Sequence, residues 1–185
     1  MKTLLRLCAC LLLGCVLTAC PETIVNEDFG LKPLALKASD WSGNWQPLDD
    51  DDMLQFSIID ASQGILRMTE PGKKEDQPLD FKLRRASADD KVKLCFALLR
   101  DKDAAPSATQ IHLMRESEKG VLLFWMINDE AVEAAIKAGQ LQGATKRVKD
   151  DPHNHLDSVP ANYTKLLEPQ FWNWSEPSVL KRNNK

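Results

Sequence analysis

The sequence predicts a β-dominated α+β fold, an antiparallel and barrel-like meander with two short helices near the C-terminal half. Short runs in which apolar and polar residues alternate recur between residues 53 and 113, separated by glycine, proline and aspartate. Two segments with helical spacing of apolar residues follow residue 127. Because consecutive short strands usually pair with their neighbours, this order favours an antiparallel meander.

The predicted strands follow one another at short intervals. They cover residues 53–60, 65–69, 79–84, 92–98 and a stretch around 111–113. Residues 60–64 fit a hairpin connection, because Gly64 directly precedes the second strand. In the third strand Leu79, Phe81 and Leu83 alternate with charged residues, which is typical of a half-buried strand.

The run 121–127 is apolar throughout and does not alternate, so we expect both of its faces to be covered. Leu122, Phe124 and Met126 should then be buried as thoroughly as the residues between them. The segment that follows predicts a covering helix, with Asn128 as its N-cap and Gly139 as its stop.

The rest of the chain predicts further short elements. Residues 141–148 are a candidate strand, and the polar stretch 150–157 is interpreted as a loop. Ser158 is a candidate cap for a second helix that has Pro160 in its first turn and ends before Pro169. Residues 171–174 and 179–180 predict a final strand or extended segment.

The first twenty residues have the pattern of an export signal. Lys2 and Arg6 precede an apolar run that is too short to span a bilayer, and the run ends in Leu17-Thr18-Ala19-Cys20. This segment resembles the lipobox of bacterial lipoproteins. The resemblance implies cleavage after Ala19 and lipidation of Cys20. We therefore divide the chain into a signal peptide (1–19), a lipidated N-terminus and tether (20–40), and one globular β-rich domain (41–185).

The resemblance also implies a location. It places the protein in the bacterial cell envelope, attached to a membrane by acyl chains such as palmitate, with its domain facing the periplasm. The choice between inner and outer membrane stays open. Removal of residues 1–19 lowers the formal net charge from −3 to −5. Because an acidic domain is repelled by an anionic membrane surface, the lipid has to provide the anchoring. The basic residues are scattered, which gives no sign of nucleic-acid binding.

Cys95 is the one cysteine outside the signal peptide and the lipobox, so the mature chain cannot form an internal disulfide. It lies within the predicted strand at 92–98. We expect it to be a small buried apolar side chain rather than a nucleophile, since a reactive thiol needs a positive partner and some exposure.

Gly43-x-Trp45 near the start of the domain and Arg182 near its end resemble the closing pair of lipocalin barrels. In that family a tryptophan of the first strand packs under an arginine of the last strand. The resemblance implies a barrel with one closed end. Trp41 and Trp45 are alternatively aromatics of the core or of the rim.

Trp172 and Trp174 are separated by one residue and would lie on the same face of a strand. They can stack on a sugar or an apolar partner, or they can seal the core. We favour the seal. Trp41, Trp45, Trp172 and Trp174 are therefore weak candidates for binding a ligand or partner.

His153 and His155 are the candidate metal ligands, because two imidazoles at this spacing can bind zinc or copper from extended chain. The solvated-loop interpretation of this segment is favoured, and we expect no cofactor. The run Asp49–Asp52 lacks the spacing of a calcium loop and is interpreted as a solvated turn.

No sequence signature of a hydrolase or of phosphate binding is present. The mature domain resembles the uncharacterised lipoproteins of bacterial envelopes. We therefore expect a non-enzymatic binding or scaffold protein with an envelope component as its partner. The alternative is a lipocalin-like protein that binds a small apolar ligand or a lipid.

Overall fold

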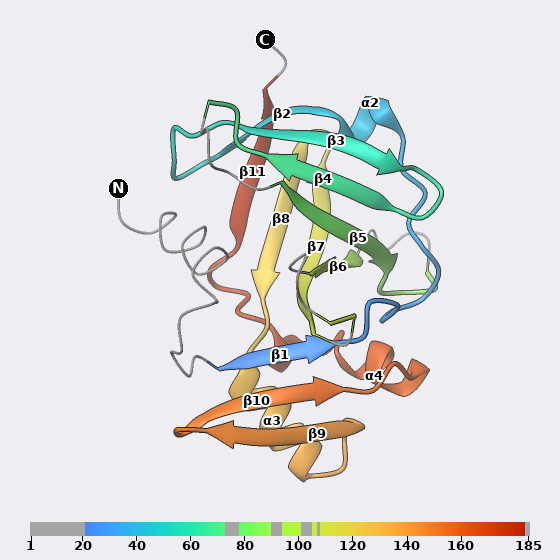
Figure 1. The fold of residues 1–185 in the computed structure, drawn as a ribbon, viewed down its shortest axis with the longest axis vertical. Coiled ribbons are helices and arrows are strands. Elements are labelled where there is room, and N and C mark those ends of the chain that lie inside the picture. Colours follow the sequence, from blue (N-terminus) through green and yellow to red (C-terminus); the bar gives the residue numbers. More distant parts are fainter. Residues whose placement is uncertain (1–20, 73–77, 90–93, 101–104, 107, 184–185) are drawn as a thin grey trace.

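Eight antiparallel strands close into a barrel in the computed structural model, which describes residues 21–183 apart from 73–77, 90–93, 101–104 and 107. Each strand pairs with the next one along the chain, and the last one closes the ring by pairing with both β8 and β2 (Figure 1). The barrel strands are β2 (Gly43–Pro47), β3 (Leu54–Asp60), β4 (Ile65–Thr69), β5 (Leu79–Arg85), β6 (Leu94–Leu99), β7 (Thr109–Glu118), β8 (Val121–Met126) and β11 (Ser178–Asn183). The predicted antiparallel, β-dominated fold is confirmed.

The alternation of side chains along each strand separates the barrel interior from its outer face. In β5, Phe81 and Leu83 are buried inside, while Asp80, Lys82 and Arg84 lie on the other face. One continuous apolar cluster fills the interior; it comprises Leu36, Trp45, Leu54, Phe56, Leu66, Met68, Phe81, Leu83, Cys95, Ala97, Leu99, Met114, Leu122 and Leu180.

One end of the barrel is closed by the short helix α2 (Ala38–Trp41) together with the last strand. Arg182 is the register partner of Trp45, and its guanidinium lies over the indole ring, 6.0 Å from the centroid. The same guanidinium donates hydrogen bonds to the backbone carbonyls of Ser39 and Ser42. The tryptophan–arginine contact expected from Gly43-x-Trp45 and Arg182 is therefore present.

A second layer is inserted between β8 and β11 and packs on the outer face of β6, β7 and β8. It contains α3 (Asp129–Lys137), β9 (Gly143–Val148), β10 (Asp151–Leu156), α4 (Pro160–Lys165) and the 3-10 helix η1 (Pro169–Phe171). Strand β1 (Glu22–Val25) joins this layer, pairing in parallel with β10 and antiparallel with β7. The protein thus has two apolar cores that share one wall of the barrel.

Helix α3 begins and ends as the sequence predicts. The side chain of Asn128 accepts a hydrogen bond from the backbone N–H of Ala131 at 3.1 Å, and Gly139 has a φ of +68° just past the helix. The second predicted helix is also present as α4, but its N-cap is Val159. Ser158 instead donates a hydrogen bond to Asp28 at 3.2 Å.

The segment expected to be a tether lies within the fold from residue 22 onward. Glu22–Val25 is strand β1, and Phe29 is fully buried between the barrel wall and α4. Residues 31–34 then form backbone hydrogen bonds with β5, and Leu36 enters the barrel core. Strand β1 has only four residues, and an alternation this short is too weak to be recognised in the sequence.

The prediction of a polar loop at 150–157 is wrong, because these residues form the end of the β9–β10 turn and strand β10. Pro152, Asn154 and Leu156 alternate as the buried positions of this strand. The pairing with β1 joins residues more than 120 positions apart. Local composition cannot reveal such a pairing, because its stabilising partner lies far away in the sequence.

The prediction that both faces of 121–127 are covered is correct for only part of the run. Leu122 is 1% exposed inside the barrel, and Trp125 is buried in the outer core. Phe124 is half-buried and Met126 is 43% exposed, because β8 leaves the barrel at its rim. In the described part of the chain, no helix has the length and apolar character needed to cross a membrane.

Candidate functional site

The barrel interior is occupied by the side chains of the protein itself. The interior cluster includes two aromatic rings in contact, Trp45 and Phe56, with centroids 5.7 Å apart. The members of this cluster are all buried, and they come from every strand of the barrel. The middle of the barrel is therefore a packed core.

The rim opposite α2 is less completely filled. His112 and Met126 are register partners there, and Phe124 lies on the same face as Met126. His112 is buried, and this burial lowers the pKa of its imidazole to about 4, so the ring is neutral at physiological pH. This rim therefore offers an apolar surface next to one neutral polar group.

An apolar row crosses the outer face of β8, β11 and β2. Leu123 is the register partner of Val179, and the backbone N–H of Leu48 donates to the carbonyl of Val179 at 3.0 Å. Cross-strand partners point to the same face of a sheet, so these three side chains form a line. Leu48 is 53% exposed.

Trp174 extends this outer surface. It is 36% exposed, and its ring packs on that of Trp125 with centroids 4.7 Å apart. The backbone N–H of the preceding residue, Asn173, donates to the carbonyl of Met126. We call Leu48, Leu123, Val179 and Trp174 the outer apolar row. Leu48 and Trp174 are its exposed members, Leu123 and Val179 are half-buried between them, and exposed apolar groups that lie together are typical of binding surfaces.

The four tryptophans that the sequence marks as binding candidates occupy different environments. Trp45 is buried in the barrel, and Trp172 is buried in the outer core, where its Nε1 donates to the carbonyl of Leu166. Trp41 is half-buried at the closed end, and its backbone carbonyl accepts a hydrogen bond from Trp45 Nε1. Trp174 is the one of the four with a large exposed surface, so the expected sealing role fits Trp172 and not Trp174.

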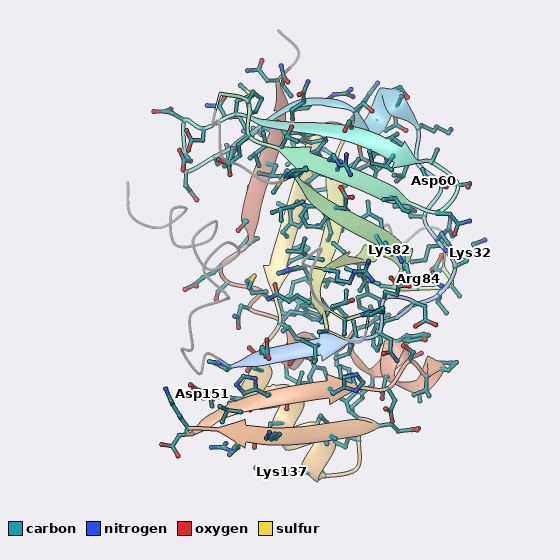
Figure 2. The ribbon with its side chains drawn as sticks, in the orientation of Figure 1. Lys32, Asp60, Lys82, Arg84, Lys137 and Asp151 are labelled. Carbon is teal, nitrogen blue, oxygen red and sulfur yellow. The ribbon has the colours of Figure 1, made fainter. Side chains whose placement is uncertain are left out.

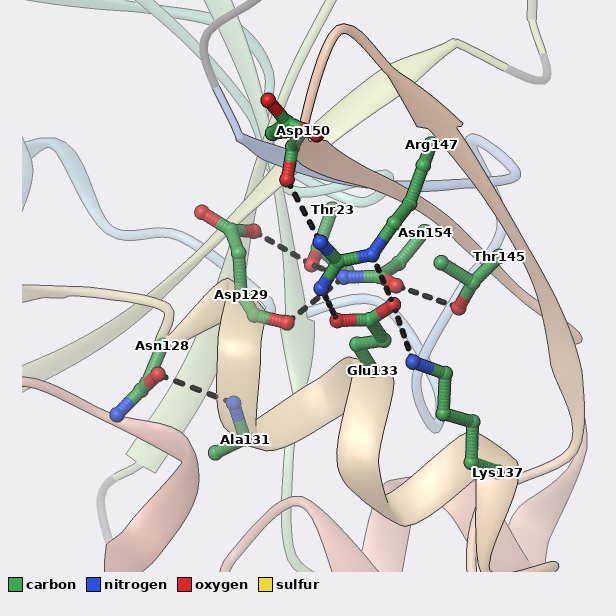
Figure 3. A network of polar contacts seen from close by, with 10 residues as sticks. All are labelled: Thr23, Asn128, Asp129, Ala131, Glu133, Lys137, Thr145, Arg147, Asp150 and Asn154. Atoms are coloured by element: carbon green, nitrogen blue, oxygen red, sulfur yellow. Dashed lines mark hydrogen bonds and ion pairs between the residues drawn. The ribbon is translucent and has the colours of Figure 1, made fainter.

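Helix α3 is joined to β9 by a charged cluster (Figure 3). Arg147 binds both carboxylate oxygens of Glu133, at 2.9 and 2.6 Å, and Lys137 lies 2.7 Å from the same carboxylate. Hydrogen bonds from Arg147 and Lys137 lower the pKa of Glu133 to about 2. Because this buried carboxylate is fully paired, the cluster serves to hold α3 on the sheet.

A second set of polar contacts connects β1, β10 and the start of α3 (Figure 3). The Thr23 hydroxyl donates to Asp129 at 2.6 Å, and Asn154 donates to Thr23 and to the carbonyl of Asp129. Thr145 in turn donates to the Asn154 side chain at 2.7 Å. Burial raises the pKa of Asp129, an effect that the Thr23 hydrogen bond opposes. These contacts fix β1 against α3.

His153 and His155 lie on β10, on the face opposite the buried Asn154. His153 Nδ1 is 2.7 Å from a carboxylate oxygen of Glu22, its register partner on β1. His155 is half-buried beside Ile24. Within the described residues, no three His, Cys, Asp or Glu side chains gather as a metal would require, so the structure does not bring a third ligand to the histidine pair.

Cys95 lies inside the barrel, where burial raises the pKa of its thiol to about 12. Its Sγ contacts the carbonyl of Met114 at 3.7 Å. A thiol with a raised pKa remains protonated and is a poor nucleophile, which agrees with the predicted packing role. The acidic run 49–52 lies in the connection between β2 and β3, where the Asp50 side chain accepts from the backbone N–H of Asp52.

Comparison with known proteins identifies no relative: no family model, curated protein or solved structure matches the chain. The candidate site therefore depends on geometry alone. Sequence analysis missed Leu48, Leu123 and Val179, the three residues that complete the outer apolar row. Their apolar character at outward-facing positions is the signal for them, but it becomes recognisable only when the pairing of β2 with β11 is known.

Proposed function

We propose that the protein is a lipid-anchored, non-enzymatic binding protein of the bacterial envelope, and that it binds its partner through the outer apolar row. The signal at Leu17–Cys20 supports the anchor. The observation that carries the proposal is the contrast between a packed barrel interior and an exposed apolar row on the outside. Because the interior is filled, we place the binding of the partner on the outer surface of the barrel.

The chemistry of the row favours a protein partner. Its exposed members are Leu48, which directly follows β2, and Trp174, which lies in the turn before β11 and packs on Trp125. Tryptophan is among the residues that most often dominate the binding energy of protein interfaces. The partner is then an envelope protein with an apolar surface of its own.

The proposal is tested by placing a photo-crosslinking amino acid at position 48 or 174 in cells that make the lipidated protein. We expect both positions to crosslink to the same partner. Ile59 provides a matched control, since it is 49% exposed on β3, outside the row. Equal crosslinking from position 59 would contradict the outer apolar row as the binding surface.

The anchor is tested separately. Cys20→Ser should abolish acyl labelling and leave the precursor uncleaved by the lipoprotein peptidase. An unchanged mass and unchanged membrane partitioning of this variant would contradict the lipid anchor.

A second function, binding of a small apolar ligand or a lipid at the barrel rim, is favoured by one observation. His112 presents a single neutral polar group beside half-buried Phe124 and exposed Met126, which is a composition found in ligand sites. The probe is a fluorescent fatty acid. Binding that is weakened at least tenfold by Met126→Asp, but not by Leu48→Asp, would favour this function over the first.

A further inference from the structure

We propose that one edge of the domain, formed by the start of β1 and the β9–β10 turn, lies against the lipid headgroups of the membrane. This inference rests on the proposed lipidation of Cys20. It adds an orientation: the acyl chains hold the domain by this particular edge and do not let it swing freely above the membrane.

The first step of the argument is the covalent reach of the chain. Cys20 precedes Glu22, the first residue of β1, by two positions. Even a fully extended chain spans only about 3.3–3.6 Å per residue, so the two α-carbons are at most about 7 Å apart. The lipid and the first residue of the sheet are therefore close neighbours.

The second step is that Glu22 is fixed to the domain. Its carboxylate lies 2.7 Å from His153 Nδ1, and the next residue, Thr23, is buried and donates to Asp129 at 2.6 Å. Val25 is fully buried in the outer core. Movement of β1 away from the sheet would break all of these contacts, so the domain has to follow the anchor.

The third step identifies the neighbouring edge from the strand register. In the parallel pairing Glu22 is opposite His153, and the register advances one residue at a time toward Val25 and Leu156. Asp151 precedes His153 on β10 by two positions and is paired with Val148 on β9. The turn at Lys149 and Asp150 thus lies on the side of the sheet at which β1 begins.

Figure 1 shows the same arrangement: β1 begins, β10 begins and β9 ends on one side of the molecule. Figure 2 labels Asp151 on that side, while Asp60, at the end of β3, lies on the opposite side. A headgroup layer that meets the start of β1 therefore meets the β9–β10 turn, and it leaves Asp60 in water.

The charges of this edge balance, so electrostatic attraction does not draw it to the lipid headgroups. Three basic and three acidic side chains balance there: Lys146, Arg147 and Lys149 against Glu22, Asp150 and Asp151. Since the mature chain carries a net charge of −5, anionic lipids would not attract the domain as a whole. The fitting surface is a layer of zwitterionic headgroups, which the lipid anchor alone brings into contact.

The test uses the acylated protein in phosphatidylcholine vesicles that carry a headgroup quencher. A fluorophore is attached to Lys146→Cys on β9 or, as the control, to Asp60→Cys; buried Cys95 does not react. We expect quenching to be several-fold stronger at position 146 than at position 60. A second variant with ten glycine and serine residues inserted between Pro21 and Glu22 should lose this difference.

The outcomes separate the two proposals. Mass spectrometry of the purified protein first reports whether Cys20 is acylated, and a missing acyl group would contradict the proposed anchor. Acylated, vesicle-bound protein that is quenched equally at positions 146 and 60 would instead overturn the orientation, as would a difference that survives the inserted linker.

Discussion

Arg182 on the last strand and Trp45 on the first barrel strand close one end of the barrel together. The guanidinium lies 6.0 Å from the indole centroid and also donates to the carbonyls of Ser39 and Ser42. A single side chain thereby joins β11, β2 and the residues around α2. Because a planar guanidinium can donate in several directions at once, lysine cannot reproduce this set of contacts.

Arg182→Ala should therefore lower the free energy of unfolding by about 2 kcal/mol, through loss of charged hydrogen bonds and of the cation–π contact. Arg182→Lys should recover less than half of that loss. Urea denaturation followed by tryptophan fluorescence measures both. The control is Lys181→Ala, the exposed neighbour on β11, which should change stability little. Equal midpoints for the variants at 181 and 182 would contradict the closing role.

Two side chains of β8 should differ in their contribution to stability. Leu122→Ala, deep in the barrel, should cost about 3 kcal/mol, within the range for truncation of a buried leucine. Phe124→Ala should cost about 2 kcal/mol despite the larger side chain, because Phe124 is half-buried near the rim. Urea denaturation again provides the measurement. A larger loss at Phe124 would show that the rim is as tightly packed as the centre.

Two glycines with the same backbone angle provide a matched pair. Gly64 and Gly139 both have a φ of +68°, which disfavours any side chain. A Cβ at Gly64 would lie 2.5 Å from the carbonyl oxygen of Leu83 and 2.9 Å from that of Leu34, whereas nothing lies within 4 Å of one at Gly139. Gly139→Ala should cost about 1 kcal/mol and Gly64→Ala clearly more. Thermal unfolding of the two variants compares them directly, and equal losses would refute the close approach at Gly64.

The loss of folding stability at acidic pH should depend on Glu133. Its pKa in the folded protein is about 2, below the value of about 4.3 for an unfolded glutamate. A lowered pKa stabilises the folded state above the unfolded pKa, and this contribution disappears as the pH falls from about 5 toward 2. In Glu133→Gln the urea midpoint should therefore fall less steeply over this range. An unchanged slope would show that the pairing with Arg147 and Lys137 does not persist in solution.

The sequence predicts the local elements of this fold better than their partners. The cap at Asn128, the stop at Gly139 and the alternation along β5 depend on neighbouring residues, and all are confirmed. The pairing of β1 with β10 depends on contacts between distant residues, and no local pattern contains it. For this reason the segment before residue 40 was expected to be a tether and the stretch 150–157 a loop.

The candidate site shows the same division. Trp174 was recognised as a binding candidate because tryptophan is informative by type alone. Leu48 is not recognisable in this way. It becomes a binding candidate only when the pairing of β2 with β11, which brings it beside Val179, is known. Trp45 and Trp172 are buried in different cores, one inside the barrel and one outside it. The barrel wall separates these cores, so their burial likewise depends on contacts between distant strands.

The closure of the barrel by β11 has a consequence for folding. Strands β2 and β8 become neighbours of β11 only when residues 178–183 are present, so the ring stays open until these residues have been made. Until then both strands have open edges that can pair with other chains. Contacts between distant segments also form slowly, because the loop has to close before the contact stabilises it. A newly made or truncated chain that lacks 178–183 therefore exposes two strand edges that the closed ring protects.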